Sequence, residues 1–280
     1  RLYSPAMSSD KPLRLAFIGA GGITRAHKQG IDKYPGQFEV AGVSDPSPGA
    51  ARALAGQFGG QTATAGDWEK LHDSLDGQLD GVIVCTPHYL HYPACAYFLE
   101  RGIPALVEKP AVCNLDELRH LQTLEDQHGA FVQAGQMQRF NPTAAWMRAF
   151  VQDPARFGQA LTFGIDIWQN INGYIHNKAD PWILDGKRAG GGITISVGIH
   201  PLDLLRYITG QDFTRITAHG RFDPPFTNAA ESSCSVLFEM SGGLTGSMHA
   251  SYTTSRIPYS QRLMLYGERG VWRPGDVMYL

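Results

Sequence analysis

Three side chains in this sequence have the chemistry needed to move a proton on and off a hydroxyl group. Lys109 follows Glu108 and precedes Pro110, just past a short apolar run, and His200 and Asp203 lie three residues apart at the start of an amphipathic stretch. A desolvated lysine can abstract a proton, and its ammonium form can polarise a carbonyl. An imidazole can relay a proton while a carboxylate orients it or binds hydroxyls. The competing interpretations are a surface Lys109–Glu108 ion pair and a histidine that only packs.

A glycine-rich turn over 19–22 separates a predicted buried strand over 13–18 from a predicted helix over 22–34. Such a turn brings backbone N–H groups and a helix N-terminus against a pyrophosphate. Thr24 occupies the third fingerprint position, where Gly or Ala is usual. Glycines fill ordinary turns more often than they bind nucleotides, but this strand-turn-helix context favours a dinucleotide site. Its expected contacts are Gly19, Gly21, Gly22 and Ile23.

Asp45 ends the second predicted strand, 24 residues beyond Gly21. At an offset of roughly 20 residues, an acidic side chain accepts hydrogen bonds from the adenosine ribose and would repel a 2′-phosphate. The position therefore predicts NAD, with NADP less favoured. The alternative is an Asx turn before Pro46.

The pattern of apolar residues changes part-way along the chain. Before residue 141, short apolar runs alternate with amphipathic stretches, which is typical of βαβ units. After it come one helix and then strand-like segments, including a predicted antiparallel hairpin over 234–252. We expect an α/β protein with a Rossmann doubly wound parallel sheet over 7–141. An α+β domain on a large open, mostly antiparallel sheet is expected over 142–280.

Composition excludes several classes of partner. A net charge of −2 without runs of Lys and Arg gives no footprint for nucleic acid or an anionic membrane, and no stretch approaches the roughly 20 apolar residues of a membrane span. The four cysteines show no Cys-x-x-Cys spacing, and nothing completes a site for His88 and His91, so no metal is expected. Residues 1–6 lack the apolar core of a signal peptide, so we expect an expression remnant and a cytoplasmic protein.

Four further motifs follow the glycine turn in order. They are Cys85-Thr86-Pro87-His88-Tyr89-Leu90-His91, Glu108-Lys109-Pro110, Arg139-Phe140-Asn141-Pro142, and Gly190-Gly191-Gly192 through Gly198-Ile199-His200-Pro201-Leu202-Asp203. Over nearly the whole chain they resemble the glucose-fructose oxidoreductase, inositol dehydrogenase and rhizopine-catabolism (Gfo/Idh/MocA) family. The resemblance implies a catalytic Lys109, an acid/base residue at or near His200, and a C-terminal sheet that commonly forms the subunit interface. We therefore expect a homodimer or homotetramer, as an uncovered apolar sheet face also predicts.

These motifs extend the expected site. The further cofactor contacts are Thr86, Pro87, His91, Glu108 and Lys109, and the expected substrate contacts are Lys109, Ser196, His200 and Trp182. Many members of the family carry Asp where this chain has Ser196, and a serine cannot act as a carboxylate base. That departure shifts the acid/base work to Lys109 and His200. Trp182 could stack on a sugar ring, although core packing explains it equally well.

The expected function is NAD(P)-dependent hydride transfer between nicotinamide and a carbinol carbon of a sugar, cyclitol or related polyol. One alternative is a redox-neutral enzyme with tightly bound NAD, of the glycoside-cleavage or epimerisation type. Another is a non-enzymatic sugar or NAD sensor on the same fold. The chain ends at Leu280, sooner than the family usually does, so we expect missing residues or a reduced second domain.

Overall fold

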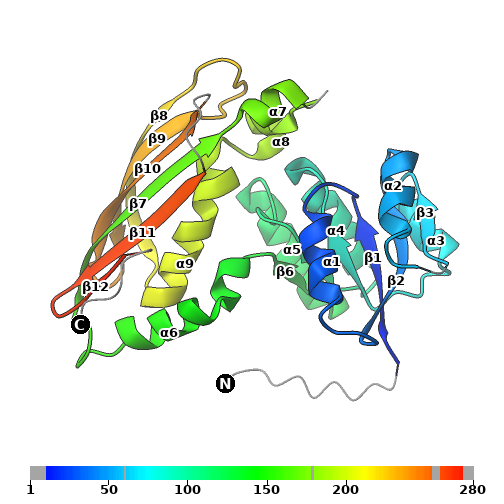
Figure 1. Cartoon of the computed structure of the whole chain (residues 1–280), viewed down its shortest axis with the longest axis horizontal. Coiled ribbons are helices and arrows are strands. Elements are labelled where there is room, and N and C mark those ends of the chain that lie inside the picture. The colour runs from blue at the N-terminus through cyan, green and yellow to red at the C-terminus, as the bar shows by residue number, and fades with distance from the viewer. Residues whose placement is uncertain (1–10, 60, 178–179, 254–258, 274–280) are drawn as a thin grey trace. The chain divides into compact units, whose positions relative to one another are not determined.

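A computed structural model describes residues 11–59, 61–177, 180–253 and 259–273, in two compact units, 1–135 and 136–280 (Figure 1). The predicted expression remnant and the C-terminal end lie outside the described residues. The boundary between the two units lies six residues before the predicted one, because the short helix η2 (Met137–Phe140) packs with α6 and α9 of the second unit. Among the described helices, none has the length and apolar character to cross a membrane.

The first unit contains a six-stranded parallel sheet in the order β3-β2-β1-β4-β5-β6. Its strands are β1 (Leu13–Ile18), β2 (Phe38–Ser44), β3 (Ala63–Ala65), β4 (Gly81–Val84), β5 (Ala105–Val107) and β6 (Val132–Ala134). The order reverses between β1 and β4. In open α/β sheets this reversal is the point at which ligands bind, beyond the carboxyl ends of the strands.

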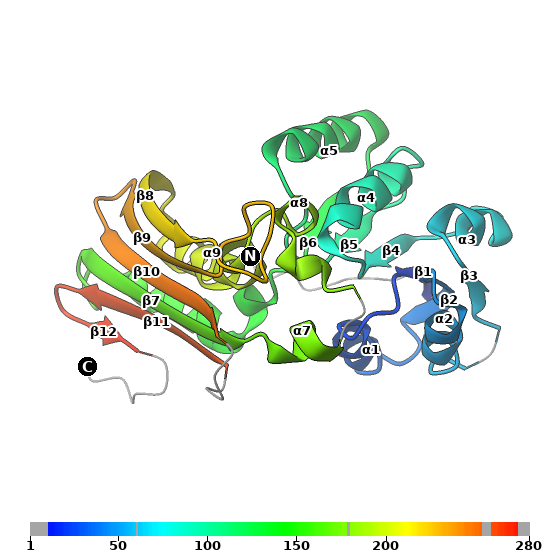
Figure 2. The same ribbon diagram turned by 90° about the horizontal axis from the view of Figure 1, so that it is seen from above.

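Helices cover both faces of this sheet, with α1 and α2 on one side and α4 and α5 on the other (Figure 2). The helices are α1 (Thr24–Ile31), α2 (Pro48–Ala55), α3 (Trp68–Ser74), η1 (His88–Leu90), α4 (His91–Leu99) and α5 (Leu115–His128). Alternate residues of β1 serve the two cores: Ala16 and Ile18 pack in the core with α4 and α5, and Phe17 packs in the core with α2. The predicted α/β class is confirmed.

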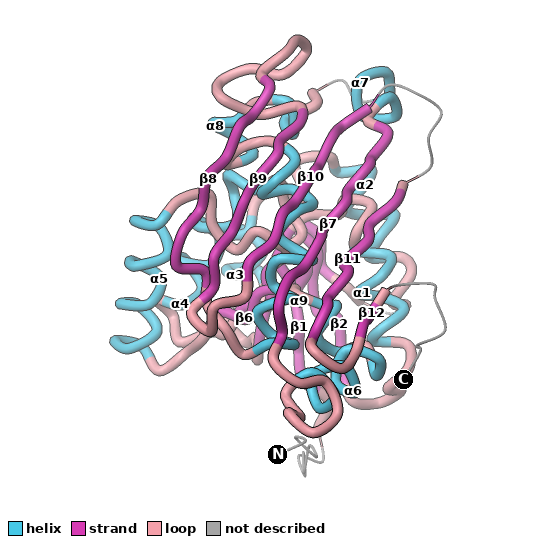
Figure 3. Tube along the Cα trace, turned by 90° about the vertical axis from the view of Figure 1, so that its left-hand side faces the viewer, coloured by secondary structure: helices cyan, strands magenta, loops and turns pink. Residues whose placement is uncertain are grey.

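The second unit contains a mixed six-stranded sheet in the order β12-β11-β7-β10-β9-β8 (Figure 3). Its strands are β7 (Ala160–Asn170), β8 (Phe213–Arg221), β9 (Ser233–Met240), β10 (Thr245–Thr253), β11 (Ser260–Gly267) and β12 (Val271–Trp272). In this second sheet, β7 and β10 are the only described strands that pair in parallel, and the other pairs are antiparallel. The antiparallel pairing of β9 with β10 confirms the predicted hairpin.

One face of the second sheet packs against α6 and α9. The helical segments of this unit are η2, α6 (Pro142–Val151), α7 (Asn172–Asn177), η3 (Trp182–Leu184), α8 (Gly186–Ala189), the π-helical η4 (Thr194–Gly198) and α9 (Ile199–Thr209). Phe150 of α6 and Leu205 of α9 are buried with Ile165 and Phe238 of the sheet in a single core. On the opposite face, Leu237 of β9 and Trp168 of β7 are 63% and 40% exposed.

Candidate active site

The predicted cofactor residues gather at the carboxyl edge of the first sheet, where backbone hydrogen bonds fix the ends of four strands. The N–H of Gly19 donates to Ser44 O at the end of β2 (2.8 Å), and the N–H of Cys85 donates to Ile18 O (2.7 Å). The N–H of Glu108 donates to Val84 O (3.0 Å). These bonds place the residues that follow β1, β2, β4 and β5 beside one another.

Gly19 can be nothing but glycine in this turn. Its φ of +93° lies in the left-handed region, and a Cβ there would lie 2.7 Å from the carbonyl oxygen of Cys85. Gly21, Gly22 and Ile23 are exposed just before α1. Thr24 departs from the usual fingerprint, but its side chain is buried and its hydroxyl donates to Gly21 O (2.7 Å). The turn therefore keeps its shape with threonine in the third position.

Asp45 lies against the glycine turn. The N–H of Ala20 donates to its Oδ2 (2.9 Å), and the N–H of Ser47 donates to its Oδ1 (2.8 Å). The second bond is the Asx turn that was the alternative interpretation. A carboxylate oxygen has two lone pairs, so each oxygen can still accept one bond from a ribose hydroxyl.

His91 holds together the loops that follow β4 and β5. It is fully buried, with Nδ1 2.6 Å from Pro110 O and Nε2 2.9 Å from Thr86 O. Burial lowers the pKa of His91, although the two carbonyl contacts oppose this shift. These contacts give His91 a role in holding the loops, in place of the direct cofactor contact expected from the sequence. Thr86 and Pro87 are half-buried beside it.

Lys109 follows β5 in the same cluster, and the Lys109–Pro110 peptide is cis. Burial lowers the pKa of Lys109, and the negative charge of Glu108 partly opposes the shift. Glu108 has its pKa below the ordinary value: burial would raise it, but hydrogen bonding and charge from His27, together with contacts to Lys109, outweigh that effect. An anionic Glu108 thus stands beside a lysine that loses its proton more readily than a solvated one.

In the second unit, the triple glycine forms the junction between α8 and the helix that carries His200. Gly190 ends α8 in the left-handed conformation (φ 84°), and Gly191 has φ 146°. A Cβ on Gly192 would lie 1.9 Å from the carbonyl oxygen of Glu231. The Glu231 carboxylate accepts the N–H groups of Gly192 (2.7 Å) and Thr194 (2.8 Å). The glycines therefore allow a backbone approach that fixes the start of the helix.

The helix begins earlier than predicted, as the π-helical segment η4 runs directly into α9. Ser196 lies in η4 and is 2% exposed, whereas His200, one turn later, is half-buried. A π-helical turn within a helix is frequent at functional sites, since it redirects the side chains around it. The two residues lie near the end of the helix that Glu231 anchors.

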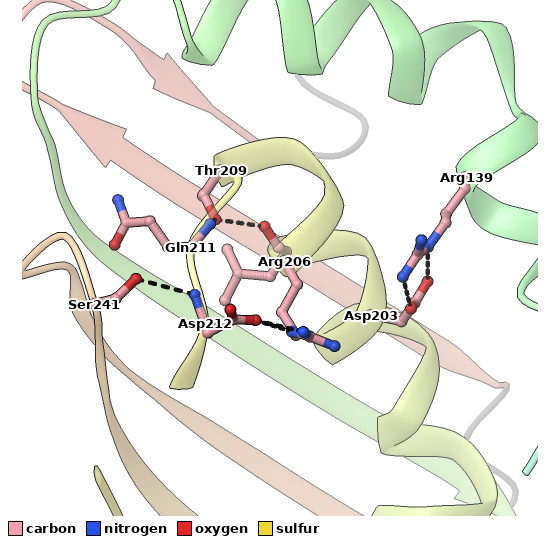
Figure 4. Close-up of polar contacts among 8 residues, drawn as sticks. Arg139, Asp203, Arg206, Thr209, Gln211, Asp212 and Ser241 are labelled. Atoms are coloured by element: carbon pink, nitrogen blue, oxygen red, sulfur yellow. Dashed lines mark hydrogen bonds and ion pairs between the residues drawn. The ribbon is translucent and has the colours of Figure 1, made fainter. Parts of the chain in front are cut away.

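Asp203 forms an ion pair with Arg139. Both of its carboxylate oxygens accept hydrogen bonds from the guanidinium of Arg139, with Nε 2.7 Å from Oδ2, and the Asp203 side chain is 11% exposed (Figure 4). This two-point ion pair ties η2 to α9. Asp203 also lines a hollow of about 370 Å³ in this unit, together with Gln136, Thr194 and Arg206.

The two tryptophans near the triple glycine in sequence have different surroundings. Trp182 is half-buried and packs against the core of the second unit, as the core-packing alternative describes. Trp168 is 40% exposed and lines a hollow with Asp166, His219 and His249 of the second sheet. Within the described part of the chain, no group of three His, Cys, Asp or Glu side chains is arranged to hold a metal ion.

Two family models match the chain in the order of its units. Residues 13–136 match the model described as an oxidoreductase family with an NAD-binding Rossmann fold, and residues 147–273 match the GFO/IDH/MocA C-terminal domain. The chain belongs to the Gfo/Idh/MocA oxidoreductase family. The resemblance seen in its motifs is confirmed.

Among similar members of the family is the rhizopine catabolism protein MocA of Rhizobium meliloti, 29% identical over 201 residues. That match covers 72% of this chain and 58% of MocA. The scyllo-inositol 2-dehydrogenase (NAD(+)) of Bacillus subtilis (strain 168) is 28% identical over 246 residues, covering 86% of this chain and 68% of that enzyme. The chain thus spans little more than half of MocA.

A similar fold is seen in the crystal structure of the WlbA dehydrogenase from Chromobacterium violaceum in complex with NADH and UDP-GlcNAcA. The TM-score is 0.85 at 22% identity, and the match covers 95% of this chain and 74% of that chain. At this identity the likeness establishes the Gfo/Idh/MocA architecture alone.

Two residues of this Gfo/Idh/MocA chain were missed by the sequence reasoning. His27 of α1 lies 2.8 Å from Glu108, 81 residues away, and Glu231 binds the start of the His200 helix from 39 residues away. Neither stands at a recognisable spacing from its partner, because both contacts are made by chain segments that meet only in the fold. For His27, the one available signal was an ionisable side chain at a position where the helical pattern of α1 predicts apolar residues.

Proposed function

We propose that this chain catalyses hydride transfer between NAD and a carbinol carbon of a sugar, cyclitol or related polyol. The observation that carries the proposal is Lys109: an amine with a lowered pKa, beside an anionic Glu108, at the sheet edge that also bears the glycine turn. Open α/β sheets bind their ligands at this edge.

The residues of the edge fit NAD. The exposed Gly21, Gly22 and Ile23 offer backbone N–H groups before α1 for a pyrophosphate, and Gly19 keeps the turn close against β4. Asp45 would accept the ribose hydroxyls and repel the 2′-phosphate of NADP. Thr86, Pro87 and Glu108 would flank the nicotinamide end. When bound, the nicotinamide supplies the hydride acceptor or donor.

Lys109 would take the hydroxyl proton during alcohol oxidation and return it during carbonyl reduction. Its lowered pKa increases the fraction of neutral amine near neutral pH, which is the form that abstracts a proton. Its ammonium form would polarise a carbonyl in the reverse direction. Glu108 remains ionised and limits how far the pKa of Lys109 falls.

His200 would provide the second acid/base group, from the helix that Glu231 anchors. Ser196 stands one turn before it and can only exchange hydrogen bonds with the substrate, since it has no carboxylate. Asp203, paired with Arg139, would orient this end of α9 and bind substrate hydroxyls through its remaining lone pairs. Trp182 would contribute an apolar wall.

A polyol substrate is supported by the activities for which the relatives are named. One acts on scyllo-inositol, and another belongs to rhizopine catabolism. Both matches leave part of the relative uncovered, so the substrate is assigned by class only. Assembly is proposed on separate grounds: Leu237 and Trp168, which are exposed on the outer face of the second sheet, would pack against another copy of the chain.

The test is a screen for NAD reduction with inositols, sugars and sugar acids, in which the absorbance of the reduced nicotinamide is measured. Lys109→Met should lower kcat by about 10²–10⁴-fold, the contribution typical of a general acid/base, while NAD still binds. Lys187→Met, an exposed lysine of the second unit, is the matched control and should retain full activity. Undiminished turnover in Lys109→Met would refute the assignment.

The same screen separates the two rival functions. A redox-neutral enzyme would convert its substrate without releasing free NADH, so product analysis would show turnover with constant absorbance. A sensor would bind NAD and sugar without converting either. Sustained accumulation of free NADH excludes both alternatives.

A further inference from the structure

His27 lies inside the first unit, one turn from the start of α1, and contacts Glu108. Its Nε2 is 2.8 Å from Glu108 Oε1, and the two side chains are 17% and 16% exposed. An ionised carboxylate can only accept, so the proton of this hydrogen bond is on Nε2 of His27 whether the ring is neutral or charged. The His27 ring also contacts Phe17, with ring centroids 6.4 Å apart in an edge arrangement.

Glu108 links this histidine to Lys109. One carboxylate oxygen faces His27, and the other accepts the backbone N–H of Lys109 (3.3 Å). A single side chain therefore connects the helix behind the glycine turn to the residue proposed as the base. Charges that are largely shielded from water interact more strongly than an exposed pair does.

Besides His27 and Lys109, ionisable groups on neighbouring elements of the first unit also interact with Glu108. Cys85 follows β4, and its pKa is raised by burial and by the charge of Glu108. His91 of α4 is buried, and its pKa is lowered chiefly for that reason. Glu108 is thus the carboxylate that acts on Lys109, and His27 is the side chain that hydrogen-bonds Glu108 from α1.

We propose that His27 is a positioning residue for Lys109: by holding the Glu108 carboxylate toward α1, it limits the attraction between that carboxylate and the lysine ammonium. A hydrogen bond to His27 draws negative charge toward one oxygen and away from the lysine. Without that bond, Glu108 can turn to Lys109 and stabilise its charged form. The inference rests on the proposed function only in taking Lys109 as the base.

The protonation of Lys109 can be followed without turnover. Only the neutral amine reacts with acetic anhydride, so the pH dependence of Lys109 acetylation, read by peptide mass spectrometry, reports its pKa. His27→Ala should move the Lys109 profile to higher pH by about one unit, the lower end of the shift that a nearby opposite charge produces. Glu108→Gln should move it to lower pH. Lys187, labelled in the same samples, is the internal control and should keep its profile.

The double variant decides whether His27 acts through Glu108. His27→Ala combined with Glu108→Gln should reproduce Glu108→Gln alone, because no carboxylate is left to redirect. His27→Gln, which retains a side-chain N–H donor, should restore much of the original profile. The acid limb of kcat/KM should move in the same direction as the acetylation profile in each variant.

Two results would overturn the inference: an unchanged Lys109 profile in His27→Ala, or the same upward shift with and without Glu108. If His27→Ala loses its fold by circular dichroism, His27→Phe keeps a ring against Phe17 and removes the donor, and its profile decides. Failure of the proposed function would look different. A chain that reduces no NAD with any polyol can still show both shifts, and an active chain can show neither.

Discussion

Gly192→Ala tests how the second unit fixes the helix that carries His200. A Cβ at this position would lie 1.9 Å from the carbonyl oxygen of Glu231 and 2.4 Å from its nitrogen. Both are backbone atoms, so the two segments must separate. Their separation strains the bonds from Gly192 and Thr194 to the Glu231 carboxylate and from the N–H of Ile193 to Glu231 O (3.1 Å).

The loss of stability expected for Gly192→Ala can be calculated from these contacts. Overpacking costs roughly 1–3 kcal/mol, and a lost hydrogen bond to a charged group adds about 1.5–3 kcal/mol. We expect the free energy of unfolding of the second unit to fall by about 3–5 kcal/mol. Urea unfolding followed by tryptophan fluorescence measures it, because Trp68 is the only one of the five tryptophans that lies in the first unit.

Gly30→Ala is the matched control. Gly30 is an exposed position of α1 with no atom within 4 Å of an added Cβ, so alanine should stabilise the first unit by roughly 0.5–1 kcal/mol. If Gly192→Ala unfolds at the same urea concentration as the unaltered protein, the close approach to Glu231 does not anchor the helix. The explanation of the triple glycine would then be wrong.

Two further predictions concern the cofactor and the assembly. Asp45→Asn should weaken NAD binding by about 10–100-fold, the equivalent of roughly 1.5–3 kcal/mol in charge-assisted hydrogen bonds, as measured by NADH fluorescence titration. Asp32→Asn, at the far end of α1, is the control. If Asp45→Asn binds the cofactor as tightly as the unaltered protein does, Asp45 does not hold the ribose. Leu237→Glu, on the outer face of the second sheet, should convert an oligomer into monomers, as measured by light scattering, whereas Leu118→Glu on α5 should not. If the molecular mass in solution of Leu237→Glu equals that of the unaltered protein, this face is not the interface.

The first unit could be predicted closely from sequence because its signals are local. The strand over 13–18 has the predicted bounds, and the apolar run before Lys109 forms the strand over 105–107. A local contact also begins α5, where Asn114 accepts the N–H of Glu117 (3.0 Å). Short elements were harder to predict. The strand over 63–65 and the helix over 68–74 were missed. The strand lies at the edge of the sheet, pairs with β2, and lacks the continuous apolar run of the strand over 105–107.

The candidate site could be predicted only in part. The residues that follow β1, β4 and β5 are set by strand ends, so the position of Gly19, Thr86 and Lys109 at the edge of the sheet could be predicted from the pattern. The side chains that orient them were not. A buried histidine with both ring nitrogens on backbone carbonyls looks, in sequence, the same as one that faces a ligand, as His91 shows.

By itself, the sequence determined the longer strands and helices of the first unit, the glycine turn and the motifs of the family, because each depends on residues a few positions apart. Tertiary structure alone decided the partners of the ionisable groups: His27 with Glu108, Arg139 with Asp203, and Glu231 with the Gly192 amide. Such contacts join segments from 39 to 81 residues apart. Their geometry, and the pKa values that follow from it, depend on burial and distance, which exist only after the chain has folded.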